Sequence, residues 1–192
     1  MTTQQLIEEL KGITQRNIDL IDVHLSHLSS HQQNWKKDAE TWSINEIFAH
    51  LNQFANYYHT AIAAKLQKTR FKEPKEIFIS SPLGRSAWKS MQLGNARNIK
   101  RKFKSPKSYN PNLHPELVTG EDTAIFVKGQ KELLTIIDNS AHVNMRKVKI
   151  PISVSKIVRL RLGDALMYIV YHYERHMQQA LNLLSHSKFP SS

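Results

Sequence analysis

Apolar residues recur along the first part of the chain with the period of an α-helix. Between about Thr3 and Leu28 they fall three or four positions apart and share one side of such a helix. The stripe consists of Leu6, Leu10, Ile13, Leu20, Ile21, Leu25 and Leu28. The polar run from Ser29 to Glu40 follows, so we expect the helix to end there in a loop.

A second helical pattern opens with a start signal. Ser43 and Glu46 have the spacing of a capping box, in which each side chain satisfies a backbone N–H of the first turn. The pattern predicts a helix from Ile44 to about Leu66. Its buried side would hold Ile47, Leu51, Phe54, Tyr58 and Ile62.

Two further helices are predicted in the second half of the chain. One spans Asp122 to Ala141, and the other starts near Asp164 as cap and continues to about Leu184. The first of these would turn inward Ile125, Phe126, Leu133, Leu134, Ile136 and Ile137. Residues 148–154 alternate as a strand does, but Pro151 interrupts them.

The stretch between about Thr69 and Gly120 has no continuous helical pattern. It contains five prolines, although a short helix from about Ser86 to Leu93 is possible. Its apolar residues predict a structured excursion: Phe71, Ile77, Phe78, Ile79, Trp88 and Met91. The chain as a whole predicts a single all-α domain over residues 1–192, a four-helix bundle with an excursion at about 69–120.

Composition narrows the chemistry that this domain offers. The chain has no cysteine, which excludes disulfides, a thiol nucleophile and a thiolate metal site. No stretch approaches the roughly 18 apolar residues of a membrane span. The N-terminus has glutamates where a signal peptide needs a basic patch. We therefore expect a soluble cytoplasmic protein with no membrane partner.

The net charge of +11 belongs to one segment. Between Lys65 and Lys107 there are thirteen Lys or Arg residues and two acidic ones, and the rest of the chain is neutral. The segment could bind nucleic acid or another polyanion through Lys100, Arg101, Lys102, Lys104 and Lys107. A simply solvated loop is the favoured interpretation.

Two histidines of the last predicted helix are spaced for joint metal binding. His172 and His176 are four residues apart and project from the same face, which they share with Ala165 and Ile169. Two buried imidazoles without partners would cost roughly 1–3 kcal/mol each. A divalent cation would remove that cost, although the pair alone is a weak motif.

A third histidine strengthens this interpretation. His50 lies in the second helix beside Leu51 of the buried stripe, and helix bundles can place ligands from facing helices in their core. Three imidazoles leave a coordination position open, as in catalytic zinc sites. Glu46 is a candidate to hydrogen-bond a ligand or to act as a base, with helix capping as its alternative role, and Tyr57 shares the face of His50.

The remaining histidines are weaker candidates. His59 lies nine residues from His50, about half a turn round the helix, and so faces away from it. A rival cluster sits at the end of the first helix: His24, His27 and His31. Because Leu25 and Leu28 take the core side there, we expect these three to be solvated.

With these residues in place, the chain resembles the DinB-like (YfiT-like) superfamily of metal-binding proteins. The segment from Trp42-Ser43 through Glu46 to His50-Leu51 is similar to the family's Trp-Ser-x-x-Glu…His-Leu segment. The segment from His172 through Arg175-His176 to Gln179 is similar to its closing His-x-x-Arg-His-x-x-Gln segment. Both occur in the family's order.

The resemblance implies an up-down-down-up bundle, a nickel or zinc ion on His50, His172 and His176, and a homodimer. Arg175 and Gln179 become candidates for contacts around the ligands. Some family members transfer a low-molecular-weight thiol to an electrophile, and others are regarded as metal-dependent hydrolases. We therefore expect a metal-dependent transferase or hydrolase, acting on a small molecule through a nucleophile whose pKa the metal lowers. The alternative is the polyanion-binding module of residues 65–107.

Overall fold

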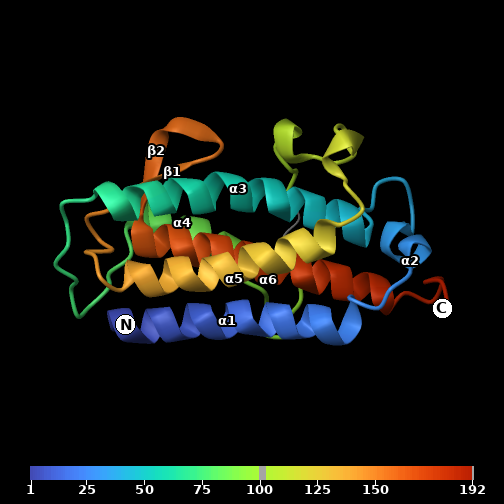
Figure 1. Ribbon diagram of the computed structural model, residues 1–192, viewed down its shortest axis with the longest axis horizontal. Helices are drawn as coiled ribbons and strands as arrows, with labels where there is room; N and C mark the ends of the chain where they lie inside the picture. The colour runs from blue at the N-terminus through green and yellow to red at the C-terminus, as the bar shows by residue number, and fades with distance from the viewer. Residues whose placement is uncertain (100–102, 192) are drawn as a thin grey trace.

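Four long helices contain a little under half of the residues of the protein. The computed structural model describes residues 1–99 and 103–191, and within these ranges the chain is mostly helical with one two-stranded sheet. The long helices are α1 (Thr3–His24), α3 (Ile44–Lys68), α5 (Asp122–Ser140) and α6 (Leu162–Leu184). They lie lengthwise beside one another (Figure 1), with α1 and α3 each packed against both α5 and α6.

Aromatic side chains join three of these helices at the centre of the core. The ring of Phe48 on α3 lies 5.0 Å from that of Phe126 on α5, and Phe126 meets Tyr173 on α6 edge-on at 5.3 Å. All three residues are almost fully buried. The predicted inward position of Ile125 is wrong, because it is 42% exposed and the neighbouring Phe126 takes the core position.

Capping boxes mark the starts of the first three helices more closely than the apolar pattern does. Ser43 and Glu46 form the predicted capping box of α3. The first helix ends at His24, before the predicted end, and the expected loop contains the short helix α2 (Ser30–Asn34). A second capping box, Ser29 with Gln32, starts α2.

The first part of the predicted excursion packs onto the helices. Helix α4 (Pro82–Met91) lies along α6, and two short 3₁₀ turns follow it, η1 (Lys107–Tyr109) and η2 (Pro115–Leu117). The helix begins four residues earlier than predicted, because a proline at the first helical position is compatible with a helix start. Of its apolar neighbours, Phe78 is buried, whereas Ile77 and Ile79 are nearly half exposed.

Asp164 fastens α4 to α6 and does not cap α6 as predicted. Helix α6 begins at Leu162 without a side-chain cap. The buried carboxylate of Asp164 accepts hydrogen bonds from the backbone N–H and the hydroxyl of Ser81, both at 3.0 Å. The Ser81 hydroxyl accepts in turn from the N–H of Gly84 at 3.0 Å, which caps α4.

A β-hairpin precedes α6, where only an interrupted strand was expected. Strand β1 (Lys149–Ile152) pairs antiparallel with β2 (Ser155–Arg161), and the register shifts between Pro151 and Ile152. A proline is tolerated at such an irregularity in a two-stranded sheet, since both strands are edge strands. The Tyr58 hydroxyl of α3 accepts a hydrogen bond from the Ser153 N–H at 3.1 Å and holds the hairpin turn.

The contact between α4 and α6 gives a test of this packing. A Cβ at Gly84 would overlap the Asp164 side chain, so Gly84→Ala should lower the free energy of unfolding by about 1–3 kcal/mol. Gly12→Ala is the control, because no described atom lies within 4 Å of a Cβ there. It should stabilise α1 by about 0.5–1 kcal/mol. Urea denaturation measures both, and equal shifts would contradict the packing.

Candidate metal centre

Three histidine side chains from two helices meet in the interior. His50 comes from α3, and His172 and His176 lie one turn apart on α6. One ligand atom from each lies within 4.8 Å of the others. The Nε2 atom of His172 is 3.4 Å from that of His50 and 3.1 Å from that of His176.

These separations fit a shared cation. Bonds of about 2.0–2.1 Å to a tetrahedral zinc place two ligand nitrogens about 3.3–3.4 Å apart. Among the described residues, this is the one group of three or more His, Asp or Glu side chains close enough to hold a metal ion. The predicted ligand set is therefore brought together by the fold.

In two of the rings, the hydrogen-bond partner of Nδ1 determines which nitrogen carries the proton. His50 Nδ1 lies 2.7 Å from the Tyr109 carbonyl oxygen, and His176 Nδ1 lies 2.9 Å from Gln179 Oε1. Each Nδ1 must donate to its oxygen, so the Nε2 atoms of both neutral rings have a free lone pair. His172 has one proton to offer, which leaves at least one buried acceptor without a donor unless a cation is shared.

His172 has no such outer anchor. Its Nδ1 is buried and has no hydrogen-bond partner among the described residues. The ring is held by aromatic neighbours, with Phe54 at 4.2 Å and Tyr168 in a parallel plane at 6.2 Å. On the other side of the cluster, Trp42 lies 4.9 Å from His50 and 6.1 Å from His176. The nitrogens are therefore surrounded largely by aromatic surface.

The surroundings keep all three imidazoles neutral. Burial lowers the pKa of His50 to about 4, although the Tyr109 carbonyl opposes the shift. Burial also lowers the pKa of His172 and His176 well below the usual 6.5, and the charges of neighbouring rings and Arg175 add to the shift. A neutral imidazole is the form that binds metal.

The four candidate residues around the ligands make different contacts. Gln179 contacts His176 directly, as described above. Glu46 caps α3 and forms an ion pair with Lys36 at 2.9 Å, so its capping role is the one that the structure displays. Tyr57 packs against the ring of Tyr58 at 5.0 Å. The Arg175 guanidinium lies over the Phe103 ring at 5.3 Å.

Four further residues contribute to the site, of which the sequence places Phe54 on the buried side of the same helix as His50 and Trp42 in the segment that resembles the family. Sequence position could indicate three of them. Phe54 is four residues from His50, Tyr168 is four residues from His172, and Trp42 precedes the helix cap. The Tyr109 carbonyl has no local signal, since a backbone atom 59 positions from His50 is placed only by the path of the chain.

The remaining histidines lie outside the cluster. His59 is buried, with its Nε2 atom 3.2 Å from the Tyr173 hydroxyl and its Nδ1 atom 3.6 Å from Glu132. The rival cluster near the end of the first helix is exposed, as predicted: His24, His27 and His31.

The basic residues proposed for polyanion binding are only partly described. Lys100, Arg101 and Lys102 lie outside the described residues. Lys104 and Lys107 are exposed on the segment that leads to Tyr109, and therefore lie near the histidine cluster.

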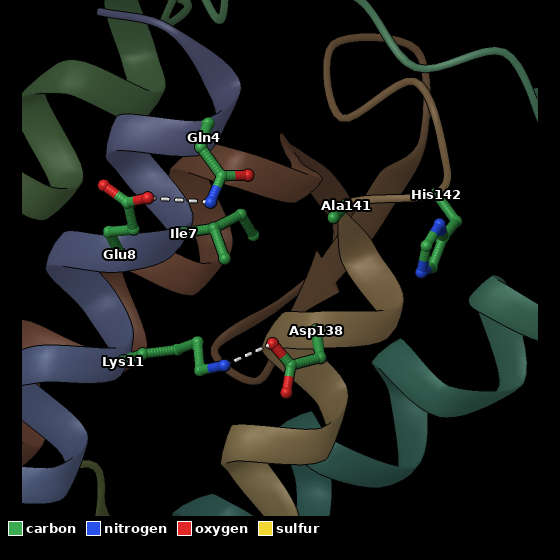
Figure 2. A pocket seen from close by; sticks show the side chains of 7 residues that line it. All are labelled: Gln4, Ile7, Glu8, Lys11, Asp138, Ala141 and His142. Carbon is green, nitrogen blue, oxygen red and sulfur yellow. Dashed lines mark hydrogen bonds and ion pairs between the residues drawn. The ribbon is translucent and has the colours of Figure 1, made fainter.

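A surface hollow of about 490 Å³ lies elsewhere, between the start of α1 and the end of α5. Figure 2 shows Lys11 reaching across it to Asp138 at 2.7 Å, with Gln4 bonded to Glu8 on the same side. The clustered histidines do not line it. The exposed ion pair contributes little stability. The hollow is therefore separate from the candidate centre.

No family model matches the chain, and neither the curated proteins nor the solved structures contain a significant match. Among the described residues, no helix is sufficiently long and apolar to cross a membrane.

The contact between Gln179 and His176 predicts a role in metal affinity. Gln179→Leu removes the acceptor that orients the ring and should weaken metal binding about 10–100-fold. Among the described residues, the neighbouring Gln178 bonds only to Asn182 at the surface, at 3.0 Å, so Gln178→Leu should leave affinity nearly unchanged. Competition with a chelating indicator measures both. Equal affinities would show that Gln179 does not orient a ligand.

The lowered pKa of His50 predicts acid sensitivity of the metal-free protein. The folded state keeps His50 neutral at pH 5, whereas the unfolded chain, with a pKa near 6.5, takes up a proton. Lowering the pH from 7 to 5 should therefore reduce the free energy of unfolding by about 2 kcal/mol through this residue. His50→Gln should remove this part of the pH dependence, and the exposed His142→Gln should keep it. Denaturant titrations with chelator compare them, and identical pH profiles would refute the assignment.

Proposed function

We propose that the protein is a divalent-metal-dependent enzyme of the DinB-like family, a thiol S-transferase or a hydrolase that acts on a small electrophilic molecule. The convergence of the Nε2 atoms of His50, His172 and His176 is the observation on which the proposal rests. The family assignment rests on the two sequence segments that contain these residues.

The fold proposed with it is a four-helix bundle of up-down-down-up topology. It is supported by the directions of the long helices, which can be followed by colour in Figure 1. Helices α1 and α6 run one way and α3 and α5 the other, and each packs against two of the other three. This places His50 on one helix opposite the paired histidines of another.

Nickel or zinc is the proposed ion. Imidazole nitrogen is a ligand that both ions accept, and the chain offers no thiolate. When bound, such an ion supplies Lewis acidity, which lowers the pKa of a water or thiol toward neutrality. Three neutral imidazoles leave its positive charge uncompensated and a coordination position available.

The chain's own residues supply orientation and exclusion of water. Tyr109 and Gln179 hold the rings of His50 and His176 with their Nε2 atoms inward. Trp42 and Phe54 cover the rings with apolar surface. In such surroundings electrostatic interactions are stronger than in water, which favours a reaction that develops negative charge.

Elemental analysis of protein purified without chelator tests the proposal. The wild type should contain about one equivalent of nickel or zinc, as a mononuclear site requires. His172→Ala should lose it, while His59→Ala should retain it, because each removes one buried imidazole but only His172 belongs to the cluster. Equal retention by the two variants, or no metal in the wild type after reconstitution, would refute the ligand assignment.

A further inference from the structure

Positive charge gathers at the end of the molecule where α3 and α5 finish and α6 begins. In Figure 1 this end holds the loop after α3, the loop after α5 and the base of the hairpin. Two segments far apart in the sequence supply the cations. We call the following six residues the basic end: Arg70, Arg146, Lys147, Lys149, Arg159 and Arg161.

Contacts show that these cations form one surface. The Phe71 carbonyl accepts a hydrogen bond from the Asn144 N–H at 2.9 Å, which joins the two loops. The charges of Arg70 and Lys147 both lie against the Phe71 ring, at 5.3 and 5.5 Å from its centre.

The hairpin continues this surface. Lys149 is paired with Arg161 across the strands, and Arg159 lies two residues from Arg161 and so points to the same side of the sheet. Lys149 and Arg159 are exposed, while the alternate residues Ile150 and Leu160 are buried. The outward face of the hairpin base is therefore cationic.

Arg161 donates to the Ile79 carbonyl at 2.6 Å, but no carboxylate of the described residues neutralises these charges. None of the six takes part in an ion pair with another described residue, including the nearby Glu73 and Glu76. Like charges directly opposite each other, as at Lys149 and Arg161, destabilise a strand pair. An external anion would relieve this repulsion.

Three other cations at this end act on the C-terminus of α3 and are left out. Lys65 and Lys68 lie in the last turn of α3, where they complement the helix dipole. Lys72 donates to the Leu66 carbonyl at 2.8 Å and helps to satisfy the end of the same helix.

We propose that the basic end binds the phosphate backbone of double-helical nucleic acid. Its cations are spread over two loops and a hairpin, which suits an extended polyanion better than a small anion. Stacking on single-stranded bases is disfavoured, because cations lie against the Phe71 ring. The exposed aromatic ring among the described residues, Phe103, belongs to the region of the histidine cluster.

This surface differs from the segment 65–107 singled out by the sequence. Lys104 and Lys107 belong to the loop beside His50, and five of the six residues of the basic end come from the part of the chain whose net charge is zero. The proposal is independent of the metal centre, since none of the six is a predicted ligand.

The proposal is tested by a salt titration of the protein with a labelled DNA duplex of arbitrary sequence. Fluorescence anisotropy measures the binding. The triple variant Lys147→Gln/Lys149→Gln/Arg159→Gln should bind at least about ten-fold more weakly at low salt. The slope of log K against log salt should fall in magnitude by about 2–3, since each phosphate contact contributes about 0.9. Its melting temperature should not fall, because the repulsion between Lys149 and Arg161 is removed.

The charge-matched control is Lys128→Gln/Lys131→Gln/Lys188→Gln, whose lysines are exposed elsewhere. Wild-type affinity and slope in this variant would support a defined surface. Equal weakening of both triple variants would overturn the proposal in favour of a net-charge effect. Absence of duplex binding by the wild type at low salt would also overturn it. The proposal would also be overturned if the protein bound anionic phospholipid vesicles in place of DNA. Ile157→Ser, at an 87% exposed position of β2, would abolish such binding.

Discussion

Three imidazole nitrogens face one another in the interior of this protein, and the surrounding structure depends on which proton or cation they share. His50 and His176 present lone pairs inward because their outer nitrogens donate to oxygen atoms of the chain. Burial keeps the rings neutral by lowering their pKa, so protons do not fill the gap at neutral pH. A shared cation would satisfy this arrangement, and the Nε2 separations of 3.1 and 3.4 Å are close to the spacing of two ligands on one ion.

Helix α6 connects this centre to most of the remaining structure. Besides His172 and His176, it presents Asp164, which holds α4, and Glu174, whose Oε1 atom pairs with Arg16 and Arg97 at 2.9 and 3.2 Å. The Glu174 pairs tie α6 to α1 and to the chain beyond α4. Glu174 is largely buried but both arginines are about half exposed, so these pairs only add to the apolar packing of α6, which sets the direction of the two imidazoles.

The two chemical features of the molecule occupy different regions. The histidine centre lies between the first half of α3 and the second half of α6, enclosed by aromatic rings. The basic end lies where α3 finishes and α6 begins, and Lys147, Lys149 and Arg159 are exposed there. The histidine cluster is surrounded by aromatic rings, whereas these three cations are exposed, so the two regions have different environments.

The sequence by itself determined the long helices and the pairing of His172 with His176, because both follow from local spacing, whereas His50 lies 122 positions from His172 and meets the pair through the fold. The 3.6-residue period marks the buried side of α1 and α3, the Ser43–Glu46 box marks a helix start, and a four-residue spacing aligns His172 with His176. Tertiary structure alone decided which distant groups meet. The Tyr109 carbonyl reaches His50, Asp164 binds Ser81, and Arg70 joins Lys147 over one ring, across 59, 83 and 77 positions of sequence. Such contacts depend on the path of the chain between the helices, for which residue periodicity carries no signal.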